Sequence, residues 1–351
     1  MSKSFVRKGL QGYRPYVPGE QPPDGEDWVK LNTNESPLPP SPRVIEAIKA
    51  AAGDSLRLYP SPTAAPARRA IAQHFGLDQA QVTVGNGADD IIEMCFRAFA
   101  GAGDRVAYPT PTYPLLVTLC LLHGAIPSPN PSGEMFTWSS ELMDDSAPLK
   151  FLVNPNSPTG TWHARPSVER VLLRSQGVVV LDEAYVDFAV ESQLPLLANH
   201  DNLLIVRTMS KSHALAGMRI GFALGNPGLI TSLDAVKDSY NVSRLAIVAA
   251  SAAIEDTEHH RKIVKHVVRE RAWLEDQLHE LGFEHSPSEA NFVFVKPALG
   301  NSAAAVADAL RERRILIRHY DLDPIDGWFR ITIGTRPQHE RLLSALREIL
   351  I

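Results

Sequence analysis

Gly177-Val-Val-Val-Leu181, followed directly by Asp182-Glu-Ala-Tyr185, is the stretch of sequence that decides the fold. The run at 177–181 is apolar on both faces, which is typical of a strand buried in a parallel sheet. It ends abruptly in a carboxylate. Because ligands bind at the carboxyl ends of the strands in open α/β sheets, this end of the strand predicts a functional site.

The same pattern recurs on both sides of this stretch. Further short apolar runs lie at residues 82–84, 105–108, 149–153, 202–206 and 220–224. Helical patterns lie between several of them, as the crossover connections of a parallel sheet require. We therefore predict an α/β protein whose main part is a doubly wound, mostly parallel sheet domain over residues 45–240.

The two ends of the chain differ from this central part. Residues 1–44 are rich in proline and glycine, which predicts an extended arm that is ordered only by packing against other segments. After Asn241 an amphipathic helical stretch at 246–281 is followed by strands and helices that pair locally. We predict a smaller α+β domain over residues 241–351, with the N-terminal arm packed against it.

Composition and charge narrow the range of functions. The 351 residues carry a net charge of -5, which argues against a nucleic-acid surface. The longest apolar run, at 115–122, is much shorter than the ~20 residues that span a bilayer, so no membrane association is expected. The first residues have no apolar core behind their charges, so we expect no signal peptide and a cytoplasmic protein.

The cysteines and histidines give no sign of a metal or disulfide framework. Cys95 and Cys120, the two cysteines, both lie among apolar residues, which predicts buried free thiols. The histidines, including His259 and His260, have no spacing typical of metal ligands, so we predict no metal site.

Lys211 is the first candidate for catalysis. It follows the apolar run at 202–206, so its amine could be partly desolvated, as a Schiff-base nucleophile requires. Thr208 and Ser210 supply hydroxyls just before it, and Arg219 supplies a guanidinium after it. Together these groups predict a phosphate site beside the amine. The alternative is a surface lysine that caps a loop.

Asp182 is the second candidate, because an unpaired carboxylate at the end of an apolar strand is energetically costly. Such a carboxylate needs a cation, and the protonated nitrogen of a pyridine ring is one. Tyr185, three residues later, could reach the phenolic oxygen of the same ring. The alternative for Asp182 is an N-cap of the next helix.

Gly85-Asn-Gly-Ala-Asp89 places glycines and free backbone amides before a predicted helix. This arrangement is suited to holding a phosphate. It is neither a Walker A motif nor the dinucleotide fingerprint, which disfavours a nucleotide-binding module. An ordinary tight turn is the alternative.

Taken together, these segments resemble the fold-type-I pyridoxal-phosphate enzymes, and specifically the histidinol-phosphate aminotransferase family. The resemblance covers nearly the whole chain. The matching motifs are Pro15-Tyr16-Val-Pro-Gly19, Leu31-Asn-Thr-Asn-Glu-Ser-Pro37, Arg57-Leu-Tyr59-Pro60, Gly85-Asn-Gly-Ala-Asp-Asp90, Pro111-Thr-Tyr113-Pro114, Asn154-Pro-Asn-Ser-Pro-Thr-Gly160, Asp182-Glu-Ala-Tyr-Val-Asp-Phe188, Thr208-Met-Ser-Lys211 through Gly217-Met-Arg219, Ala290-Asn-Phe292 and Arg330-Ile-Thr-Ile-Gly334.

The resemblance implies a role for each matched residue around the cofactor pyridoxal 5'-phosphate. Lys211 would hold the cofactor as a Schiff base and move the substrate proton. Asp182 would pair with the ring nitrogen, Tyr185 would hydrogen-bond the ring hydroxyl, and Tyr113 would stack on the ring. The residues implied to hold the phosphate are Ala88, Asp89, Thr208, Ser210 and Arg219.

The resemblance also implies an assembly and a substrate site. Tyr59 would reach into the active site of a second subunit, which implies a homodimer. Tyr16, Arg318 and Arg330 would bind the phosphate or carboxylate of the substrates, an amino donor and a 2-oxo acid.

Two positions depart from the family pattern. The family has an asparagine directly before Pro-Thr-Gly, whereas this chain has Ser157 there and Asn156 one residue earlier. Either Asn156 contacts the cofactor ring through a shifted loop, or Ser157 makes a weaker contact. Ser212 and His213 replace the small and aromatic residues common after the lysine, and we interpret His213 as a packing residue.

The function that this resemblance implies is the transfer of an amino group from L-histidinol phosphate to 2-oxoglutarate, which gives imidazole acetol phosphate and glutamate in histidine biosynthesis. An aromatic amino-acid aminotransferase and a threonine-phosphate decarboxylase are alternatives, since they share the fold and the cofactor motifs. A non-catalytic cofactor sensor joined to a DNA-binding domain is disfavoured by the negative net charge.

Overall fold

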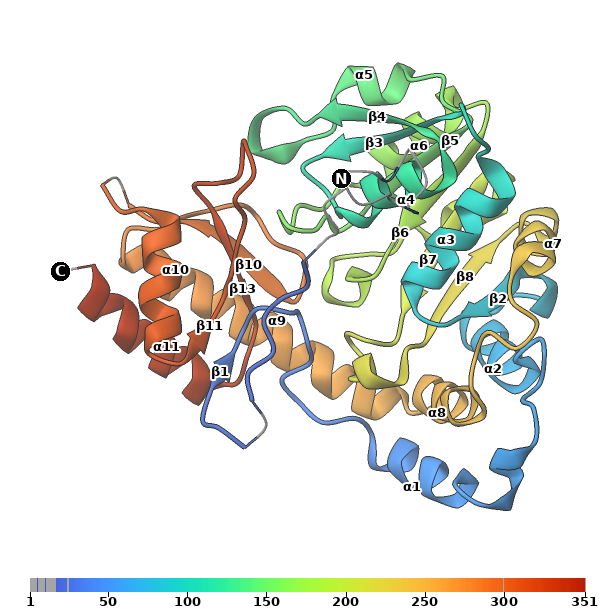
Figure 1. The fold of residues 1–351 in the computed structure, drawn as a ribbon, viewed down its shortest axis with the longest axis horizontal. Coiled ribbons are helices and arrows are strands. Elements are labelled where there is room, and N and C mark those ends of the chain that lie inside the picture. The colour runs from blue at the N-terminus through green and yellow to red at the C-terminus, as the bar shows by residue number, and fades with distance from the viewer. Residues whose placement is uncertain (1–4, 6–9, 11–16, 24, 299, 351) are drawn as a thin grey trace.

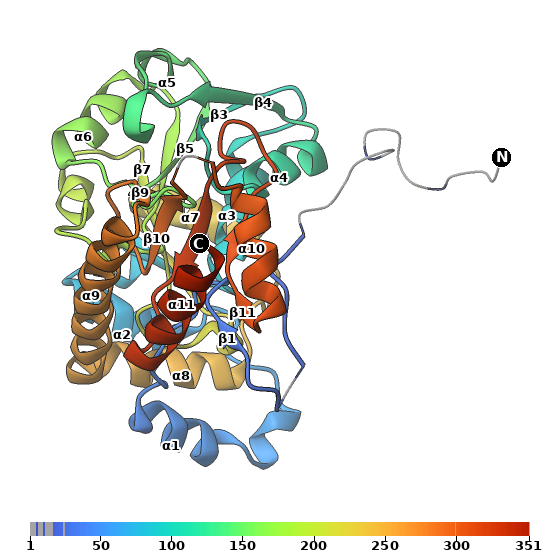
Figure 2. The same cartoon turned by 90° about the vertical axis from the view of Figure 1, so that its left-hand side faces the viewer.

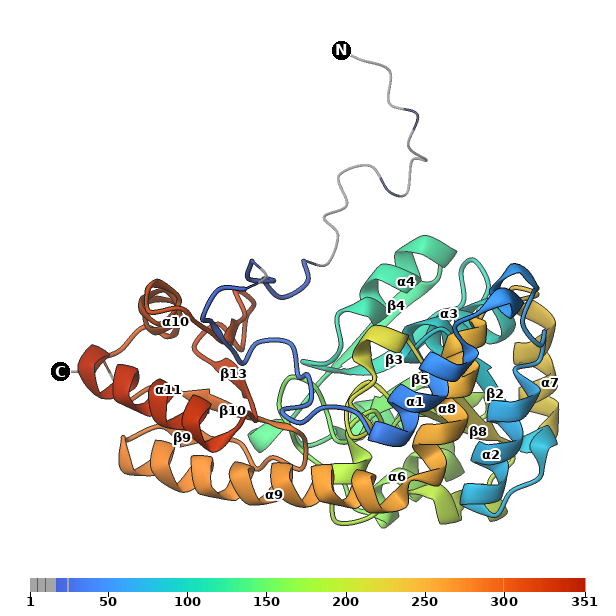
Figure 3. The same ribbon diagram turned by 90° about the horizontal axis from the view of Figure 1, so that it is seen from below.

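The computed structural model describes residues 5, 10, 17–23, 25–298 and 300–350. Two bodies lie side by side in Figure 1, a larger one with a seven-stranded sheet and a smaller one with a four-stranded sheet. Helix α9 (Thr257–Glu280) connects them, and Figure 3 shows it running along the underside from the smaller body toward the larger.

The larger sheet has the order β2-β8-β7-β6-β5-β3-β4. Its strands are β2 (Val82–Gly85), β3 (Arg105–Thr110), β4 (Ile126–Pro131), β5 (Leu149–Val153), β6 (Val178–Asp182), β7 (Leu203–Thr208) and β8 (Gly221–Gly225). All neighbouring strands are parallel except that β8 runs antiparallel to both β2 and β7. The predicted doubly wound, mostly parallel sheet is confirmed.

Side chains alternate along each strand, so the apolar strands of this sheet present apolar side chains on both faces. Helices cover both faces and bury these side chains. Leu203 and Ile205 of β7 point into one core, while Leu204 and Val206 point into the other. The first core contains α1 (Pro42–Ala51), α2 (Ala65–Phe75), α5 (Ser140–Asp144), α6 (Arg165–Arg174) and α8 (Arg244–Glu255). The second contains α3 (Ala88–Phe99), α4 (Leu115–His123) and α7 (Pro227–Val236).

Strand β4 forms one edge of the sheet and was not predicted from the sequence. Its residues Ile126-Pro-Ser-Pro-Asn-Pro131 pair in parallel with β3. Prolines disfavour a strand assignment because they lack the N–H that a ladder needs, but an edge strand needs donors on one side only. The N–H of Ile126 donates to the Asp104 carbonyl, so by alternation the three prolines face outward.

The smaller body has a four-stranded sheet of order β12-β13-β10-β9, with antiparallel neighbours. Its strands are β9 (Glu284–His285), β10 (Phe292–Lys296), β12 (Arg318–His319) and β13 (Phe329–Thr332), and its helices are α9, α10 (Ala303–Glu312) and α11 (Arg336–Ile349). Strand β1 (Val29–Lys30), from the N-terminal arm, pairs in parallel with β11 (Ile315–Leu316) beside this sheet, as Figure 2 shows.

The helical stretch expected at 246–281 is two helices rather than one. Helix α8 ends at Glu255 and α9 begins at Thr257. Asp256 separates them because its side chain accepts a hydrogen bond from the backbone N–H of His259 at 3.2 Å, as an N-cap does. The apolar side chains of α8 belong to the core of the larger body, whereas those of α9 pack in the smaller one.

Short 3-10 turns complete the fold. They are η2 (Asp54–Arg57), η3 (Gln79–Gln81), η4 (Glu134–Phe136), η5 (Val186–Phe188), η6 (Leu194–Ala198) and η7 (Ala216–Met218). Cys95 and Cys120 are buried and free, as predicted, and burial raises the pKa of Cys120 to about 11. No helix in the described part of the chain is long and apolar enough to cross a membrane.

Candidate active site

A cavity of about 490 Å³ lies at the carboxyl ends of the central strands of the larger sheet. Segments from both bodies line this cavity. Arg330 of β13 and Asn34 of the N-terminal arm line it together with residues at the ends of β6 and β7. The predicted site residues in its lining are Ala88, Asp89, Tyr113, Asp182, Tyr185, Thr208, Ser210, Lys211, Arg219 and Arg330. The strand ends therefore converge as the sequence predicted.

Lys211 lies three residues beyond the end of β7 and is partly buried. Its Nζ is 5.6 Å from the centre of the Tyr185 ring. No hydrogen bond or ion pair from the described residues holds this amine, although Asp182 lines the same cavity. An amine in this setting is available to react with a carbonyl group.

Asp182 ends β6 with only 6% of its surface exposed. Its carboxylate accepts one hydrogen bond from the described residues, from the backbone N–H of Ala184 at 2.9 Å, and it forms no ion pair with them. Burial raises the pKa of Asp182 to about 7, and the nearby Asp89 adds to this effect, while Ala184 and Lys211 oppose it. A ligand with a positively charged nitrogen would satisfy this carboxylate.

The raised pKa of Asp182 makes the stability of the cofactor-free protein depend on pH. Because burial raises its pKa from 3.8 to about 7, the folded state binds more protons than the unfolded state between these values. Stability therefore falls as the pH rises through this window. Asp182→Asn is expected to raise the free energy of unfolding by roughly 1–3 kcal/mol at pH 8 and to change it little near pH 4. Thermal unfolding at both pH values checks this, and a less stable variant at pH 8 would contradict it.

A phosphate-sized cradle lies where α3 begins. Gly87 has a φ of +90°, and a Cβ there would lie 2.6 Å from Nη2 of Arg219. A Cβ on Gly221 would lie 2.4 Å from the backbone nitrogen of Ala88, so both glycines are needed for this close approach. No side chain of a described residue caps the first turn of α3, which leaves its N–H groups available for an anion beside the Arg219 guanidinium.

Hydroxyl groups complete this part of the cavity. Thr208 Oγ1 donates to Ser210 Oγ at 2.9 Å, and both are buried. Tyr113 Oη donates to Asp89 Oδ1 at 3.1 Å. These contacts preorganise polar groups around the cradle before any ligand binds.

Asn34 also lines the cavity and is not among the site residues predicted from the sequence. Its Nδ2 donates to Tyr185 Oη at 3.0 Å, and its own oxygen accepts from Thr332 Oγ1 at 3.0 Å. It therefore fixes the tyrosine hydroxyl in the cavity. The signal in the sequence is its position in the motif Leu31-Asn-Thr-Asn-Glu-Ser-Pro37.

Arg330 is 8% exposed and lines the cavity from β13. Its Nη1 donates to Ser157 Oγ and its Nη2 to the Asn32 carbonyl, both at 3.1 Å. Within the described part of the chain, its Nε has no hydrogen-bond partner and no carboxylate forms an ion pair with it. A buried guanidinium with only neutral partners is suited to an anionic ligand.

The remaining predicted residues have other surroundings. Asn156 is buried, and its amide contacts Pro111, Thr112 and Thr159, whereas Ser157 lines the cavity. Arg318 donates to the carbonyls of the arm at positions 17 and 18. Tyr59 is 77% exposed and stacks on Tyr240. Tyr16 lies outside the described residues. The roles given to these four residues stay predictions.

The chain matches the family described as aminotransferase class I and II over residues 26–346. Histidinol-phosphate aminotransferase 1 of Nostoc sp. is 42% identical over 350 residues, 99% of this chain and 98% of that protein. The histidinol-phosphate aminotransferase of Acetobacter pasteurianus is 45% identical over 344 residues, 96% of this chain and 95% of that protein. Among solved structures, histidinol-phosphate aminotransferase from Sinorhizobium meliloti in complex with pyridoxal-5'-phosphate matches with a TM-score of 0.90 at 28% identity, covering 99% of this chain and 98% of that one. The chain therefore belongs to the histidinol-phosphate aminotransferase family of class I and II aminotransferases.

Proposed function

We propose that this aminotransferase moves the amino group of L-histidinol phosphate to 2-oxoglutarate and uses pyridoxal 5'-phosphate as its cofactor. The observation that carries the proposal is the presence of two guanidinium groups, those of Arg219 and Arg330, in one cavity with a lysine amine. One guanidinium suits the cofactor phosphate and the other suits an anionic group of the substrate. Histidinol phosphate and 2-oxoglutarate each carry such a group.

The residues present fit the cofactor. Asp182 would hold the proton of the ring nitrogen, and Tyr185, fixed by Asn34, would donate to the ring hydroxyl. The first turn of α3 and Arg219 would hold the phosphate, with Thr208 and Ser210 beside them. When bound, pyridoxal phosphate supplies an electron-withdrawing ring that stabilises negative charge at the substrate carbon.

The protein's own groups would then bind the substrate and move its proton. Lys211 Nζ would accept the proton from the substrate carbon and deliver it again, because it is an amine in the cavity that no hydrogen bond or ion pair from the described residues holds. Arg330 would hold the substrate's phosphate in the first half of the reaction and a carboxylate of 2-oxoglutarate in the second. Ser157, whose hydroxyl accepts a hydrogen bond from Arg330, would orient that guanidinium.

The visible absorption spectrum of the purified protein loaded with pyridoxal phosphate tests this proposal. L-Histidinol phosphate is expected to abolish the absorption band of the lysine-bound cofactor, and 2-oxoglutarate is expected to restore it. If the band is unchanged by histidinol phosphate but is abolished by an aromatic amino acid or by threonine phosphate, the substrate belongs to one of those classes instead. A protein that binds no pyridoxal phosphate would overturn the whole proposal.

We also propose a homodimer in which Tyr59 reaches the neighbouring active site. Tyr59 is not among the residues that line its own cavity, and its ring stacks on Tyr240 at 4.5 Å. Leu56 and Leu58, on either side of Arg57, are each about half exposed. Exposed apolar and aromatic side chains clustered in this way are typical of a surface that a partner covers.

For the domain organisation, we propose an arm at 1–44, a large domain that begins at residue 45, and a small domain that continues to residue 351. The pairing of β1 with β11 supports an arm packed against the small domain. The division predicted near residue 241 stays a prediction, and the packing of α8 in the larger core supports a division closer to Asp256. A biosynthetic role would place the protein in the cytoplasm.

A further inference from the structure

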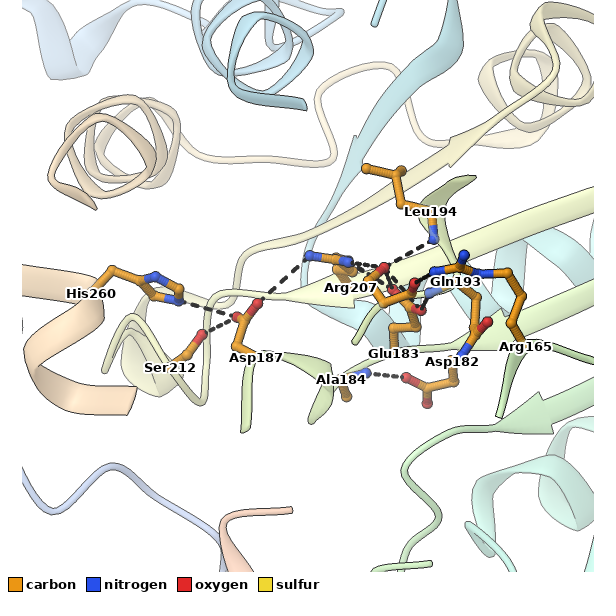
Figure 4. A network of polar contacts seen from close by, with 11 residues as sticks. Arg165, Asp182, Glu183, Ala184, Asp187, Gln193, Leu194, Arg207, Ser212 and His260 are labelled. Atoms are coloured by element: carbon orange, nitrogen blue, oxygen red, sulfur yellow. Dashed lines mark hydrogen bonds and ion pairs between the residues drawn. The ribbon is translucent and has the colours of Figure 1, made fainter. Parts of the chain in front are cut away.

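Asp187, in η5, receives contacts from three residues in two separate segments of the chain (Figure 4). Its Oδ2 accepts hydrogen bonds from Ser212 Oγ and from Nε2 of His260, the latter at 3.2 Å. Its Oδ1 lies 3.6 Å from Nη1 of Arg207. The partners belong to the loop after β7, to α9 and to β7 itself, so one carboxylate joins both bodies of the molecule.

The charge on Asp187 is stabilised by these partners. Burial alone would raise its pKa, but the hydrogen bond from His260 and the guanidinium of Arg207 outweigh burial and hold the pKa well below the usual range. Arg207 is itself fixed, because its Nε and Nη2 donate to Oε2 of Glu183 at 3.0 and 2.7 Å. Charge-assisted hydrogen bonds of this kind fix geometry, so Asp187 is a rigid anchor.

The anchor acts directly beside the candidate catalytic amine. Ser212 is the covalent neighbour of Lys211, and its buried hydroxyl donates to Asp187. On the other side, Asp187 follows Asp182 and Tyr185 in the segment after β6. One carboxylate therefore holds together the two segments that bring the amine and the ring-contacting side chains to the same cavity.

Helix α9 supports η5 at a second point. Arg271, eleven residues beyond His260, donates from Nη1 to the carbonyl of Phe188 at 3.2 Å and to that of Ala290 at 2.8 Å. Ala290 leads into β10 of the smaller sheet. The position of η5 is thus coupled to the body that carries Arg330.

We propose that Asp187 is a positioning residue that holds Lys211, through Ser212, where its amine can reach the cofactor. This inference rests on the proposed function. Its physical basis is that a displacement of about 1 Å at a reacting group can lower a rate by about 100-fold. Asp187 is not among the residues that line the cavity, and acts through Ser212, His260 and Arg207.

A metal site is the competing interpretation, because Asp187, His213 and His260 are the group of potential ligands found among the described residues, with ligand atoms within 4.8 Å of one another. The guanidinium of Arg207 beside Asp187 opposes a second cation there. Burial lowers the pKa of His213 to about 3, and its neutral ring stacks on His260 at 4.4 Å. These contacts favour the predicted packing role of His213.

The test compares two cofactor forms in Ser212→Ala and Asp187→Asn. The lysine amine condenses with the aldehyde of pyridoxal phosphate with loss of water, whereas pyridoxamine phosphate has no aldehyde and depends on the phosphate cradle and Asp182. Both variants are expected to bind pyridoxal phosphate at least ~10-fold more weakly and pyridoxamine phosphate within about twofold of the wild type. Equilibrium dialysis of the cofactor-free protein, without any turnover, measures both affinities.

Asp145→Asn is the matched control. Asp145 is a buried carboxylate that accepts from Ser128 Oγ and from Nη2 of Arg105, both at 2.8 Å, away from the cavity. It is expected to lower the melting temperature and to leave both affinities unchanged. Ser212→Ala removes a single hydroxyl, so it keeps the test informative if Asp187→Asn does not fold.

The outcomes separate the two proposals. An equal loss of affinity for both cofactor forms would assign Asp187 a structural role only and overturn the positioning role, as would wild-type affinities in both variants. If added Zn²⁺ restored the affinity of either variant for pyridoxal phosphate, the metal site would be favoured instead. A wild-type protein that binds neither form would overturn the proposed function itself, whatever the variants do.

Discussion

Lys211→Ala is expected to abolish transamination. The variant loses both the amine that bonds the cofactor and the base that moves the substrate proton, and a positioned general acid–base group alone contributes up to about 10⁴-fold in rate. Glutamate formation from histidinol phosphate and 2-oxoglutarate measures the loss. Lys49→Ala, an exposed lysine of α1 paired with Glu46, is the control and is expected to keep wild-type activity.

The same variant tests the homodimer and the role of Tyr59. In a mixed dimer of a Lys211→Ala chain and a Tyr59→Ala chain, one site has both changes and the other has neither, provided that Tyr59 acts across the interface. Random mixing is therefore expected to restore about one quarter of wild-type activity. If Tyr59 acted within its own chain, each site would carry one change and no activity would return. A protein that sediments as a monomer would overturn the dimer directly.

Arg330→Ala is expected to produce the second-largest effect. It should lower kcat/KM by about 10²- to 10³-fold for both histidinol phosphate and 2-oxoglutarate. The reason is that removing one partner of a buried charge pair costs roughly 2–5 kcal/mol. Arg330→Lys is expected to recover only part of this, since a lysine cannot make the two-pronged contact of a guanidinium. Steady-state kinetics with each substrate varied in turn measure both. The control is Arg174→Ala, an exposed arginine paired with Asp144, which is expected to behave as wild type.

The way in which kcat and KM change for each substrate decides how the Arg330 variants are interpreted. A loss in KM with little change in kcat would show that Arg330 binds ground state and transition state alike. Full activity with histidinol phosphate alongside a loss with 2-oxoglutarate would move the phosphate to another cation of the chain, for which Arg318 is the predicted candidate.

Most of the larger sheet was predictable because its strands are short apolar runs that end in polar residues. The stretch at 177–185 predicted both the position of β6 and the place of Asp182 at its carboxyl end. The antiparallel direction of β8 could not be inferred from its residues, because the direction of a buried strand depends on its connections rather than on its pattern. The break at Asp256 had a local signal, a capping aspartate, but the apolar periodicity continued through it.

The site was predictable where strand ends supply it, and less so where distant segments meet. Asp182, Lys211 and Arg219 lie near the ends of β6 and β7 and the start of β8, and the topology alone brings them together. The contact of Asn34 with Tyr185 joins positions 151 residues apart and requires the arm to cross between the two bodies. The hydrogen bond between Ser157 and Arg330 likewise joins positions 173 residues apart. No local pattern encodes such pairings.

The prolines of β4 have a consequence beyond the architecture of the sheet. An edge strand normally offers a row of unpaired N–H groups on which another chain can add a strand, and this is a common route to aggregation. Pro127, Pro129 and Pro131 leave the outer side of β4 with no such donor along its length. A folding intermediate that exposes this sheet before its helices dock would therefore be protected from edge-to-edge association on that side. Replacing these prolines with valine or threonine would remove that protection while leaving the active site, at the ends of the central strands, intact.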